Sequence, residues 1–345
     1  MKKILLTVAL AALLLGGIGA YGVSRLYEGA DEPYRGYGGA EVFVDIAPGT
    51  TTAGIGRQLA EAGVVEDQRT FRVALWRSGR DRLLQAGEYR FTESASALDV
   101  IDVLARGQVH LRTVTFPEGL TRWEMAEVFG RSEFGVDEEF LAASERADLV
   151  EDLDPDATDL EGYLFPETYA LPRGATADDL VEAMLAQFRR TFDDALLAQA
   201  AEQEMTVRQV VTLASLIQRE TGRDDERPIV SAVYTNRLHR RMPLQCDPTV
   251  IYALQLDGLY DGNLTRDNLR YDSPYNTYVY PGLPPVPIAA PGAADLRAAL
   301  APADVSYVYF VSRNDGSHVF ADTLREHNRN VREYQIEYFR RRRTP

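Results

Sequence analysis

Residues 206–222 read TVRQVVTLASLIQRETG and carry the clearest structural signal in the chain. Thr206 is a good helix N-cap, and Gln209 completes a capping box three residues later. Apolar side chains then recur with helical spacing at Val210, Leu213, Ala214 and Ile217. Glu220 follows Ile217 by three residues, so it falls on the same inward stripe. The segment predicts an amphipathic helix from Thr206 to Thr221 with Glu220 facing the interior.

Glu220 also lies in the last turn of this predicted helix, because Gly222 is a natural residue to follow a helix end. The negative end of the helix dipole and burial both disfavour a charged carboxylate there, so both raise its pKa. A raised pKa is what a general acid needs near neutral pH. The alternative is a glutamate that turns outward and forms an ion pair with Arg219, Arg223 or Arg227.

The region around this helix has a mixed pattern. A strand over LRTVTF opens it at Leu111, a second amphipathic helix is expected over Ala177–Phe192, and YVYFV at 307–311 predicts a short strand. Residues 247–291 are dense in Asp, Asn, Pro, Gly and Tyr and are expected to be irregular. Residues 111–345 therefore predict one larger α+β domain.

A smaller unit precedes it at residues 42–110. A strand (VFVDI), two helices (IGRQLAEAGVV and TFRVALWRSG), a returning strand (AGEYRF) and a short helix over Leu98–Leu104 follow one another. This order predicts a compact βααβ-like module. Residues 26–41 are rich in Gly, Pro, Tyr and charge and are expected to form a tether.

The N-terminus is apolar enough for a membrane helix. Lys2 and Lys3 precede an uncharged stretch from Ile4 to Val23, close to the length of about 20 residues that a spanning helix needs. Residues 1–25 are therefore expected to form a single-pass anchor with a cytoplasmic N-terminus. The alternative is a cleaved signal peptide, and either reading places the rest of the chain outside the cytoplasm.

Composition excludes several classes of function. The chain has 345 residues and a formal net charge of -15, the wrong sign for tracking a phosphate backbone, so no nucleic-acid partner is expected. Cys246 is the one cysteine, and the four histidines are not spaced as metal ligands, so neither an internal disulfide nor a metal or other cofactor is expected. Serine-nucleophile, P-loop and GxGxxG motifs are absent from the sequence.

Other carboxylates compete with Glu220 for a catalytic role. Glu161 and Glu167 bracket an aromatic run, EGYLFPETY, that could form a cleft wall or plain hydrophobic packing. Asp247 begins DPT and is expected to cap a helix over VIYAL. The tyrosine-rich stretch YDSPYNTYVYPGLPP at 271–285 offers aromatic faces, amides and hydroxyls that suit a sugar chain, although such loops also simply pack.

Several motifs together resemble the YceG-like (MltG) endolytic murein transglycosylase family. LASLIQRE at 213–220 is similar to the family's LASIIxKE, whose last glutamate is catalytic, and PLQCDPTVIY at 243–252 is similar to PLQSDPTVIY. The motifs SPYNTY and GLPP are also similar to the family's, and LEGYLFPETY from Leu160, YFVSRNDGSHVF from Tyr309 and His327-Asn328 complete the family order. The departures are Gln218, Glu167, Val286 and Cys246, the last standing where Ser or Thr is usual.

The resemblance implies a peptidoglycan lytic transglycosylase, a lyase that cleaves MurNAc-GlcNAc bonds within nascent strands and leaves 1,6-anhydro-MurNAc ends. It implies a LysM-like module at 42–110, a plasma-membrane location with an extracytoplasmic catalytic domain, a role in ending strand elongation, and contact with peptidoglycan synthases. Glu220 would be catalytic. The hypothesis adds as substrate-binding residues Gln245, Asp247, Tyr275, Asn276, Thr277, Tyr163, Glu161 and His318.

Two other functions compete with this interpretation. One is a hydrolytic muramidase that uses Glu161 or Asp247 as a second carboxylate. The other is a wall-binding scaffold without activity. Anhydro product ends would exclude the first, and activity that is lost on changing Glu220 would exclude the second.

Overall fold

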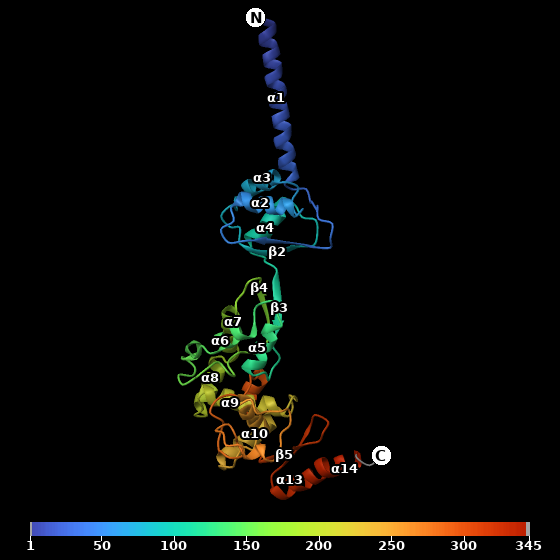
Figure 1. The fold of residues 1–345 in the computed structure, drawn as a ribbon. Helices are drawn as coiled ribbons and strands as arrows, with labels where there is room; N and C mark the ends of the chain where they lie inside the picture. The colour runs from blue at the N-terminus through green and yellow to red at the C-terminus, as the bar shows by residue number, and fades with distance from the viewer. Residues whose placement is uncertain (1, 343–345) are drawn as a thin grey trace. The chain divides into compact units, whose positions relative to one another are not determined.

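The computed structural model describes the backbone of residues 2–342 and the side chains of residues 10, 13–18 and 20–340. The chain divides into two compact units (Figure 1). Unit 1 holds the chain up to Arg112 together with Ala170–Gly174, and unit 2 holds Thr113–Tyr169 and the chain from Ala175 onward. Each unit is described by itself below.

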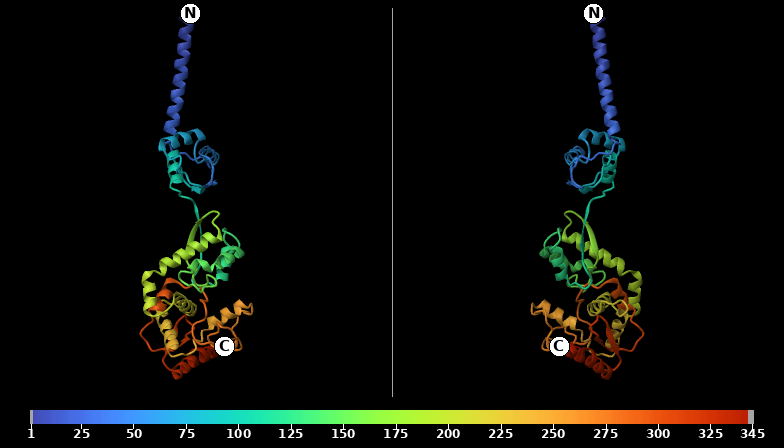
Figure 2. Two further views of the ribbon diagram at one scale, coloured as in Figure 1. Left: turned by 90° about the vertical axis from the view of Figure 1, so that its left-hand side faces the viewer. Right: turned by 90° about the vertical axis from the view of Figure 1, so that its right-hand side faces the viewer.

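Unit 1 begins with α1 (Lys2–Gly29), a helix of 28 residues that is drawn without interruption in every view (Figures 1 and 2). The expected anchor at residues 1–25 falls on this helix, and its side chains at 1–9, 11, 12 and 19 lie outside the described part. In the part that is described, no helix has both the length and the apolar character needed to cross a membrane. Leu13, Leu15 and Ile18 on α1 are 75%, 70% and 61% exposed.

The rest of unit 1 follows the predicted βααβ order. The elements are β1 (Val42–Ile46), α2 (Thr52–Glu61), α3 (Gln68–Ser78), β2 (Gly87–Phe91) and α4 (Ala97–Ala105). The two strands pair antiparallel, with Val42 opposite Phe91 and Ile46 opposite Gly87. Asp67 caps α3 by accepting hydrogen bonds from two backbone amides, and Gly79 ends it in the left-handed conformation at φ 65°.

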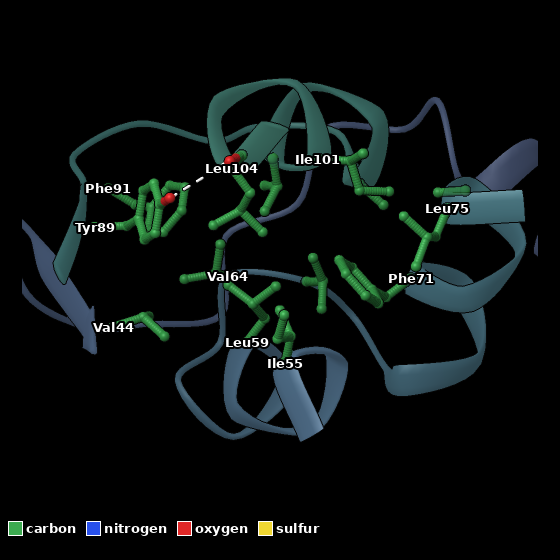
Figure 3. Packing of buried hydrophobic residues seen from close by; sticks show 14 of the residues in the cluster. Val44, Ile55, Leu59, Val64, Phe71, Leu75, Tyr89, Phe91, Ile101 and Leu104 are labelled. Atoms are coloured by element: carbon green, nitrogen blue, oxygen red, sulfur yellow. Dashed lines mark hydrogen bonds between the residues drawn. The ribbon is translucent and has the colours of Figure 1, made fainter. Parts of the chain in front are cut away.

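One hydrophobic core holds unit 1 together (Figure 3). Phe71 from α3 and Leu59 from α2 point into it and are fully buried. Tyr89 from β2 is buried as well, and its hydroxyl donates to the carbonyl oxygens of Gln85 and Leu104 at 2.9 and 3.4 Å. Burying the ring while satisfying its hydroxyl avoids the cost of an unpaired polar group in the core.

The expected tether at 26–41 is not a free linker. Ala30 is fully buried in the unit 1 core, and Tyr34 exchanges backbone hydrogen bonds with Ala95 at 3.0 and 3.2 Å. The Gly36 amide donates to the Gly63 carbonyl oxygen at 2.8 Å. A Cβ on Gly63, which has φ 72°, would lie 2.7 Å from the Gly36 carbonyl carbon. The prediction failed because it was made from the low hydrophobicity of the segment. Backbone hydrogen bonds hold the segment in place, and these do not depend on the side chains.

Unit 2 is mostly helical, as Figures 1 and 2 show in colours from green to red. Its strands form two-stranded sheets, one of β3 with β4, whose residues are divided between the units, and one of β5 with β6. The strands are β3 (Leu111–Thr115), β4 (Thr168–Pro172), β5 (Tyr309–Ser312) and β6 (His318–Ala321). The helices are α5 (Arg122–Gly130), α6 (Asp137–Ser144), α7 (Ala177–Thr191), α8 (Asp194–Glu202), α9 (Val207–Glu220), α10 (Arg227–His239), α11 (Asp247–Leu256), α12 (Ala293–Leu300), α13 (Leu324–Val331) and α14 (Tyr338–Arg342). Short 3-10 turns at Ala147–Val150 and Asn268–Arg270 and a π-helical turn at Arg332–Glu337 complete the unit. The α+β composition is therefore confirmed.

Helix α9 packs against α8, α10, α11 and α12. The predicted capping box is present, since the Thr206 hydroxyl accepts from the Gln209 amide and the Gln209 side chain accepts from the Thr206 amide. Every residue from Val210 to Ile217 is buried, so the helix is enclosed on all sides and not on one stripe only. Its first turn, at 207–209, and its last, at 218–220, are the parts that reach solvent.

The segment at 247–291 is less irregular than expected. Its first ten residues form α11, which contains the helix expected over VIYAL. The remainder consists of turns and is held from inside by Asn276, whose side-chain amide donates to the carbonyl oxygens of Leu269 and Tyr271 at 3.2 and 2.7 Å. This loop lies along α11 and brings Tyr278 to the start of that helix.

Candidate active site

A cavity of about 230 Å³ opens at the end of α9 in unit 2. It is lined by residues from α9, α10, α11, β5, α13 and two loops. The lining residues are Glu220, Arg237, Leu244, Gln245, Asp247, Tyr278, Phe310 and His327. The cavity therefore collects side chains that are separated by up to about a hundred positions in the sequence.

Glu220 is the last residue of α9 and lines this cavity. The Tyr234 hydroxyl donates to its Oε1 at 2.7 Å. Tyr234 is buried on α10, and its ring packs edge to face with Phe310 at a centroid distance of 6.1 Å. This bond fixes the orientation of the Glu220 carboxyl at the cavity.

Burial raises the pKa of Glu220, as the sequence predicted. Hydrogen bonds from Tyr234 and Cys246 act in the opposite direction, because both favour the charged carboxylate, and the negative charge of Asp247 adds to the increase. The net direction is upward. The carboxyl therefore keeps its proton to a higher pH than an ordinary glutamate, as a general acid requires.

The alternative ion pair of Glu220 is not formed. Arg219 donates instead to the Gly119 carbonyl oxygen at 2.9 Å. The other two arginines pair with aspartates, Arg223 with Asp225 at 2.9 Å and Arg227 with the buried Asp295 at 2.7 Å. Among the described residues, each of these three guanidinium groups thus has a partner other than the Glu220 carboxyl.

Cys246 is buried directly behind Glu220, between the start of α11 and Tyr234. Burial and the neighbouring carboxyl raise the pKa of its thiol, so the thiol stays neutral. The group that contacts Glu220 from this position is thus a thiol, a weaker hydrogen-bonding group than a hydroxyl.

Arg237 fixes one wall of the cavity. Its guanidinium donates to the carbonyl oxygens of Val308, Pro243 and Leu244 at 2.6, 3.1 and 2.9 Å, and to the Gln245 side-chain oxygen at 3.3 Å. Gln245 itself has φ 53°, a left-handed conformation that is uncommon for a residue other than glycine. The strained backbone aims the Gln245 side chain into the cavity, and the buried arginine holds it there.

Asp247 lines the same cavity as Glu220, but it does not cap α11. The N-cap is Cys246, without a side-chain hydrogen bond, and Asp247 is already the first residue of the helix. Its Oδ1 accepts a hydrogen bond from the Tyr278 hydroxyl at 2.5 Å. The capping prediction is wrong because a long-range partner, 31 residues away, takes the carboxylate that local geometry would have used.

His327 completes the far wall. Its ring stacks on Tyr309 at 4.9 Å, and burial together with the positive charge of Arg237 lowers its pKa, which favours a neutral ring. Its Nδ1 is buried and has no hydrogen-bond partner among the described residues. The His327-Asn328 motif was visible in the sequence, but the position of His327 in the cavity was not predicted. A role at this site was likewise not predicted from the sequence for Tyr234, Arg237, Leu244, Tyr278 or Phe310.

Asn276, Thr277, Tyr163 and Glu161 do not line the cavity, contrary to expectation, because their side chains are buried elsewhere. Asn276 shapes its own loop, as described above. Thr277 accepts a hydrogen bond from the Cys246 amide at 3.0 Å. The Tyr163 hydroxyl donates to Asp154 at 2.6 Å within the core. Their role is to support the fold around the cavity.

Glu161 is a second buried carboxyl with a raised pKa. It accepts hydrogen bonds from the Arg122 amide at 3.1 Å and from the Tyr252 hydroxyl at 3.4 Å. Burial raises its pKa to about 8. A carboxyl that is neutral at pH 7 does not serve as the second, charged carboxylate of a hydrolase. Of the two candidates for that role, Glu161 and Asp247, only Asp247 therefore remains.

Neither Tyr275 nor His318 lines the cavity. The Tyr275 ring packs on Tyr252 at 5.1 Å. The ring Nδ1 of His318 lies 2.7 Å from a Glu226 oxygen, and its backbone amide donates to the other oxygen at 2.8 Å. Their contact with substrate stays a prediction. Within the described residues, no three His, Cys, Asp or Glu side chains gather closely enough to hold a metal ion.

Comparison with known proteins finds relatives over most of the chain. A curated endolytic murein transglycosylase of Bacillus subtilis strain 168 is 29% identical over 338 residues, which cover 93% of this chain and 91% of the relative. That of Streptococcus pneumoniae D39 is 29% identical over 324 residues, covering 85% of this chain and 58% of the relative. The crystal structure of a YceG-like protein from Listeria monocytogenes superposes with a TM-score of 0.57 at 26% identity, over 84% of this chain and 98% of the other.

The YceG-like family model matches residues 44–333, which include most of unit 1 after α1 and all of the cavity-lining residues. The match therefore covers well over half of the chain. The chain belongs to the YceG-like family.

Proposed function

We propose that this protein is an endolytic peptidoglycan lytic transglycosylase that uses Glu220 as its one catalytic acid and base. The observation that carries the proposal is the Glu220 carboxyl itself. It lines a cavity, its pKa is raised, and one of its two oxygens is held by Tyr234. The curated relatives named endolytic murein transglycosylase support the same activity.

In the first step, protonated Glu220 donates its proton to the oxygen of the MurNAc-GlcNAc bond. The bond from MurNAc C1 to that oxygen breaks, and positive charge develops at C1. Glu220 is left as a carboxylate, which Tyr234 stabilises by its hydrogen bond. The charge of Asp247, held in place by Tyr278, lies on the same cavity and favours the cationic centre.

In the second step, the Glu220 carboxylate takes the proton of the MurNAc C6 hydroxyl. The freed oxygen attacks C1 and closes a 1,6-anhydro ring, while Glu220 recovers its proton. No water is consumed, so a second catalytic carboxylate is not needed. Gln245, Arg237 and neutral His327 offer donors and an acceptor for sugar hydroxyls and amides.

The wider assignment follows from the same activity. Residues 1–25 anchor the protein in the plasma membrane with the N-terminus in the cytoplasm, which places unit 2 where peptidoglycan is made. The 42–110 module is LysM-like and binds the glycan strand. Cleavage within nascent strands ends their elongation beside the peptidoglycan synthases. The length and apolar character of the sequence from Ile4 to Val23 support the anchor.

The product decides between lytic and hydrolytic cleavage. We expect the purified protein to release fragments that end in 1,6-anhydro-MurNAc, and mass spectrometry separates these from reducing ends by the mass of one water. Reducing ends would instead favour a hydrolase with Asp247 as second carboxylate. The two carboxyl groups of Asp247 and Glu220 line the same cavity, as such a hydrolase requires. Absence of both products would leave only the scaffold function.

Replacing Tyr234 by Phe is expected to move the pH profile. Activity requires protonated Glu220, so kcat/KM falls as pH rises through the pKa of that carboxyl. The Tyr234 hydrogen bond lowers this pKa, and removing it raises the pKa further. The alkaline limb should therefore shift upward by about one pH unit, while the maximum falls roughly tenfold.

A merely structural role for Tyr234 would lower activity equally at all pH values. Tyr278→Phe is the matched control, because it removes a tyrosine hydroxyl from Asp247 and leaves the Glu220 bond intact. Profiles of kcat/KM with the same alkaline limb for Tyr234→Phe and the unmodified protein would contradict the assignment.

A further inference from the structure

Helix α3 is fastened to the last turn of α1. The Arg77 guanidinium donates to the Tyr27 carbonyl oxygen and to Asp31, both at 2.8 Å, and lies over the Tyr27 ring at 4.1 Å. A Cβ on Gly29 of α1 would sit 3.8 Å from the Thr70 methyl group of α3. Because Ala30 is buried in the core, α1 and α3 belong to one packed unit without a flexible joint.

The outer face of α3 carries two arginines and a tryptophan. Arg69, Arg72 and Trp76 are spaced three and four residues apart, so they share one exposed face of the helix. Phe71 and Leu75 of the same helix point into the core (Figure 3). Trp76 is 77% exposed, the highest value among the large apolar side chains described. A tryptophan left in water beside cationic side chains is unusual for a face without a partner.

The charge of this face differs from that of the whole chain. Helix α3 has no acidic residue, whereas the chain carries a net charge of -15. Among the described residues, neither Arg69 nor Arg72 forms an ion pair. The two guanidinium groups are therefore available to an anionic partner.

The position of α3 along α1 identifies that partner. The apolar stretch of α1 ends at Val23, and Tyr27 follows four residues later, a rise of about 6 Å along the helix. The headgroup layer on each side of the hydrocarbon core is roughly 5–8 Å thick. If α1 spans the bilayer, Tyr27 and the helix docked on it lie at headgroup level. Trp and Tyr are enriched at this level, and Arg binds anionic headgroups there.

We propose that the face of Arg69, Arg72 and Trp76 docks on the surface of a bilayer that contains anionic lipid. Trp76 inserts its ring among the headgroups, and the arginines bind lipid phosphates. The inference rests on the proposed membrane anchor. It adds that unit 1 lies against the membrane on one defined face, so it is not free to swing about the end of α1.

Tryptophan fluorescence tests this directly, because Trp76 and Trp123 are the two tryptophans of the chain. The full chain with Trp123→Phe is reconstituted into vesicles of phosphatidylcholine with about a quarter phosphatidylglycerol, with or without lipids brominated near the headgroup. We expect brominated lipid to quench Trp76 emission by roughly half or more. In the Trp76→Phe protein, emission from Trp123 should not change. If Trp123→Phe folds poorly, the emission of Trp76 is obtained by subtracting the emission of the Trp76→Phe protein from that of the unmodified chain.

Charge reversal tests the arginines. Arg69→Glu with Arg72→Glu should reduce the quenching at least about twofold, and omitting phosphatidylglycerol should do the same. Flotation of the vesicles reports the anchor separately. Protein that floats with vesicles but shows unquenched Trp76 would overturn the docking face and leave the anchor standing, whereas protein that does not float would overturn both. If the quenching of Trp76 emission were the same after charge reversal and in vesicles without phosphatidylglycerol, the assignment to anionic lipid would be overturned.

Discussion

Replacing Glu220 by Gln is expected to lower the rate of glycan-strand cleavage by at least about a thousandfold. Gln has the shape of Glu but neither donates a proton to the glycosidic oxygen nor takes one from the C6 hydroxyl. Both steps depend on this one residue, so no second group compensates. The measurement is the rate of release of anhydro-terminated fragments from purified glycan strands at saturating enzyme.

Glu167→Gln provides the matched control, since Glu167 brackets the aromatic run in sequence but its side chain is exposed and outside the cavity. It should cleave at the rate of the unmodified protein. Equal thermal unfolding of the three proteins would show that the Glu220 change leaves the fold intact. Cleavage by Glu220→Gln at the native rate would refute both the catalytic role of Glu220 and the proposed chemistry.

Replacing Glu161 by Gln is expected to make stability less dependent on pH. The pKa of Glu161 is about 8 in the folded protein, against a reference value of 4.5. Because the folded protein favours the protonated carboxyl, the contribution of Glu161 to the free energy of unfolding is fully present below about pH 4.5. This contribution is lost as pH rises toward 8, since the unfolded chain releases the proton more readily than the folded protein does. Gln has no proton to lose and so lacks this trend. Relative to the unmodified protein, the variant should gain on the order of 3 kcal/mol between about pH 5 and about pH 9.

The comparison is the change in unfolding free energy of unit 2 at the two pH values, read from denaturant curves of variant and unmodified protein. Any fixed cost of the Gln amide cancels, because it is the same at both pH values. Glu167→Gln again serves as control and should show no such difference. If Glu161→Gln followed the unmodified protein at both pH values, Glu161 would be charged in the fold and would return as a candidate second carboxylate.

The local elements were predictable because their signals are local. The capping box at Thr206 and Gln209, the apolar period of α9 and the βααβ order of unit 1 each depend on residues within one or two turns or strands. The two local predictions that failed, the tether at 26–41 and the cap by Asp247, failed where a distant partner intervened. Ala95 pairs with Tyr34, and Tyr278 binds Asp247.

The composition of the cavity was not predictable in the same way. The motifs identified Glu220, Gln245 and Asp247 as candidates, and all three line it. Asn276 and Thr277 belong to a motif of the same kind, yet both are buried and support the loop. A motif marks residues that a family needs, and it does not separate those that touch a cavity from those that hold its walls.

By itself the sequence determined the helix that ends at Glu220 and the resemblance to the YceG-like family, and it predicted the direction in which the pKa of that carboxyl is shifted. Only the tertiary structure decided which groups meet that carboxyl. Tyr234 on α10, Cys246 and Asp247 at the start of α11, and His327 on α13 converge around it through packing. The physical reason is that helix caps and apolar periods are set by neighbours along the chain, whereas hydrogen-bond partners and burial depend on contacts between distant segments.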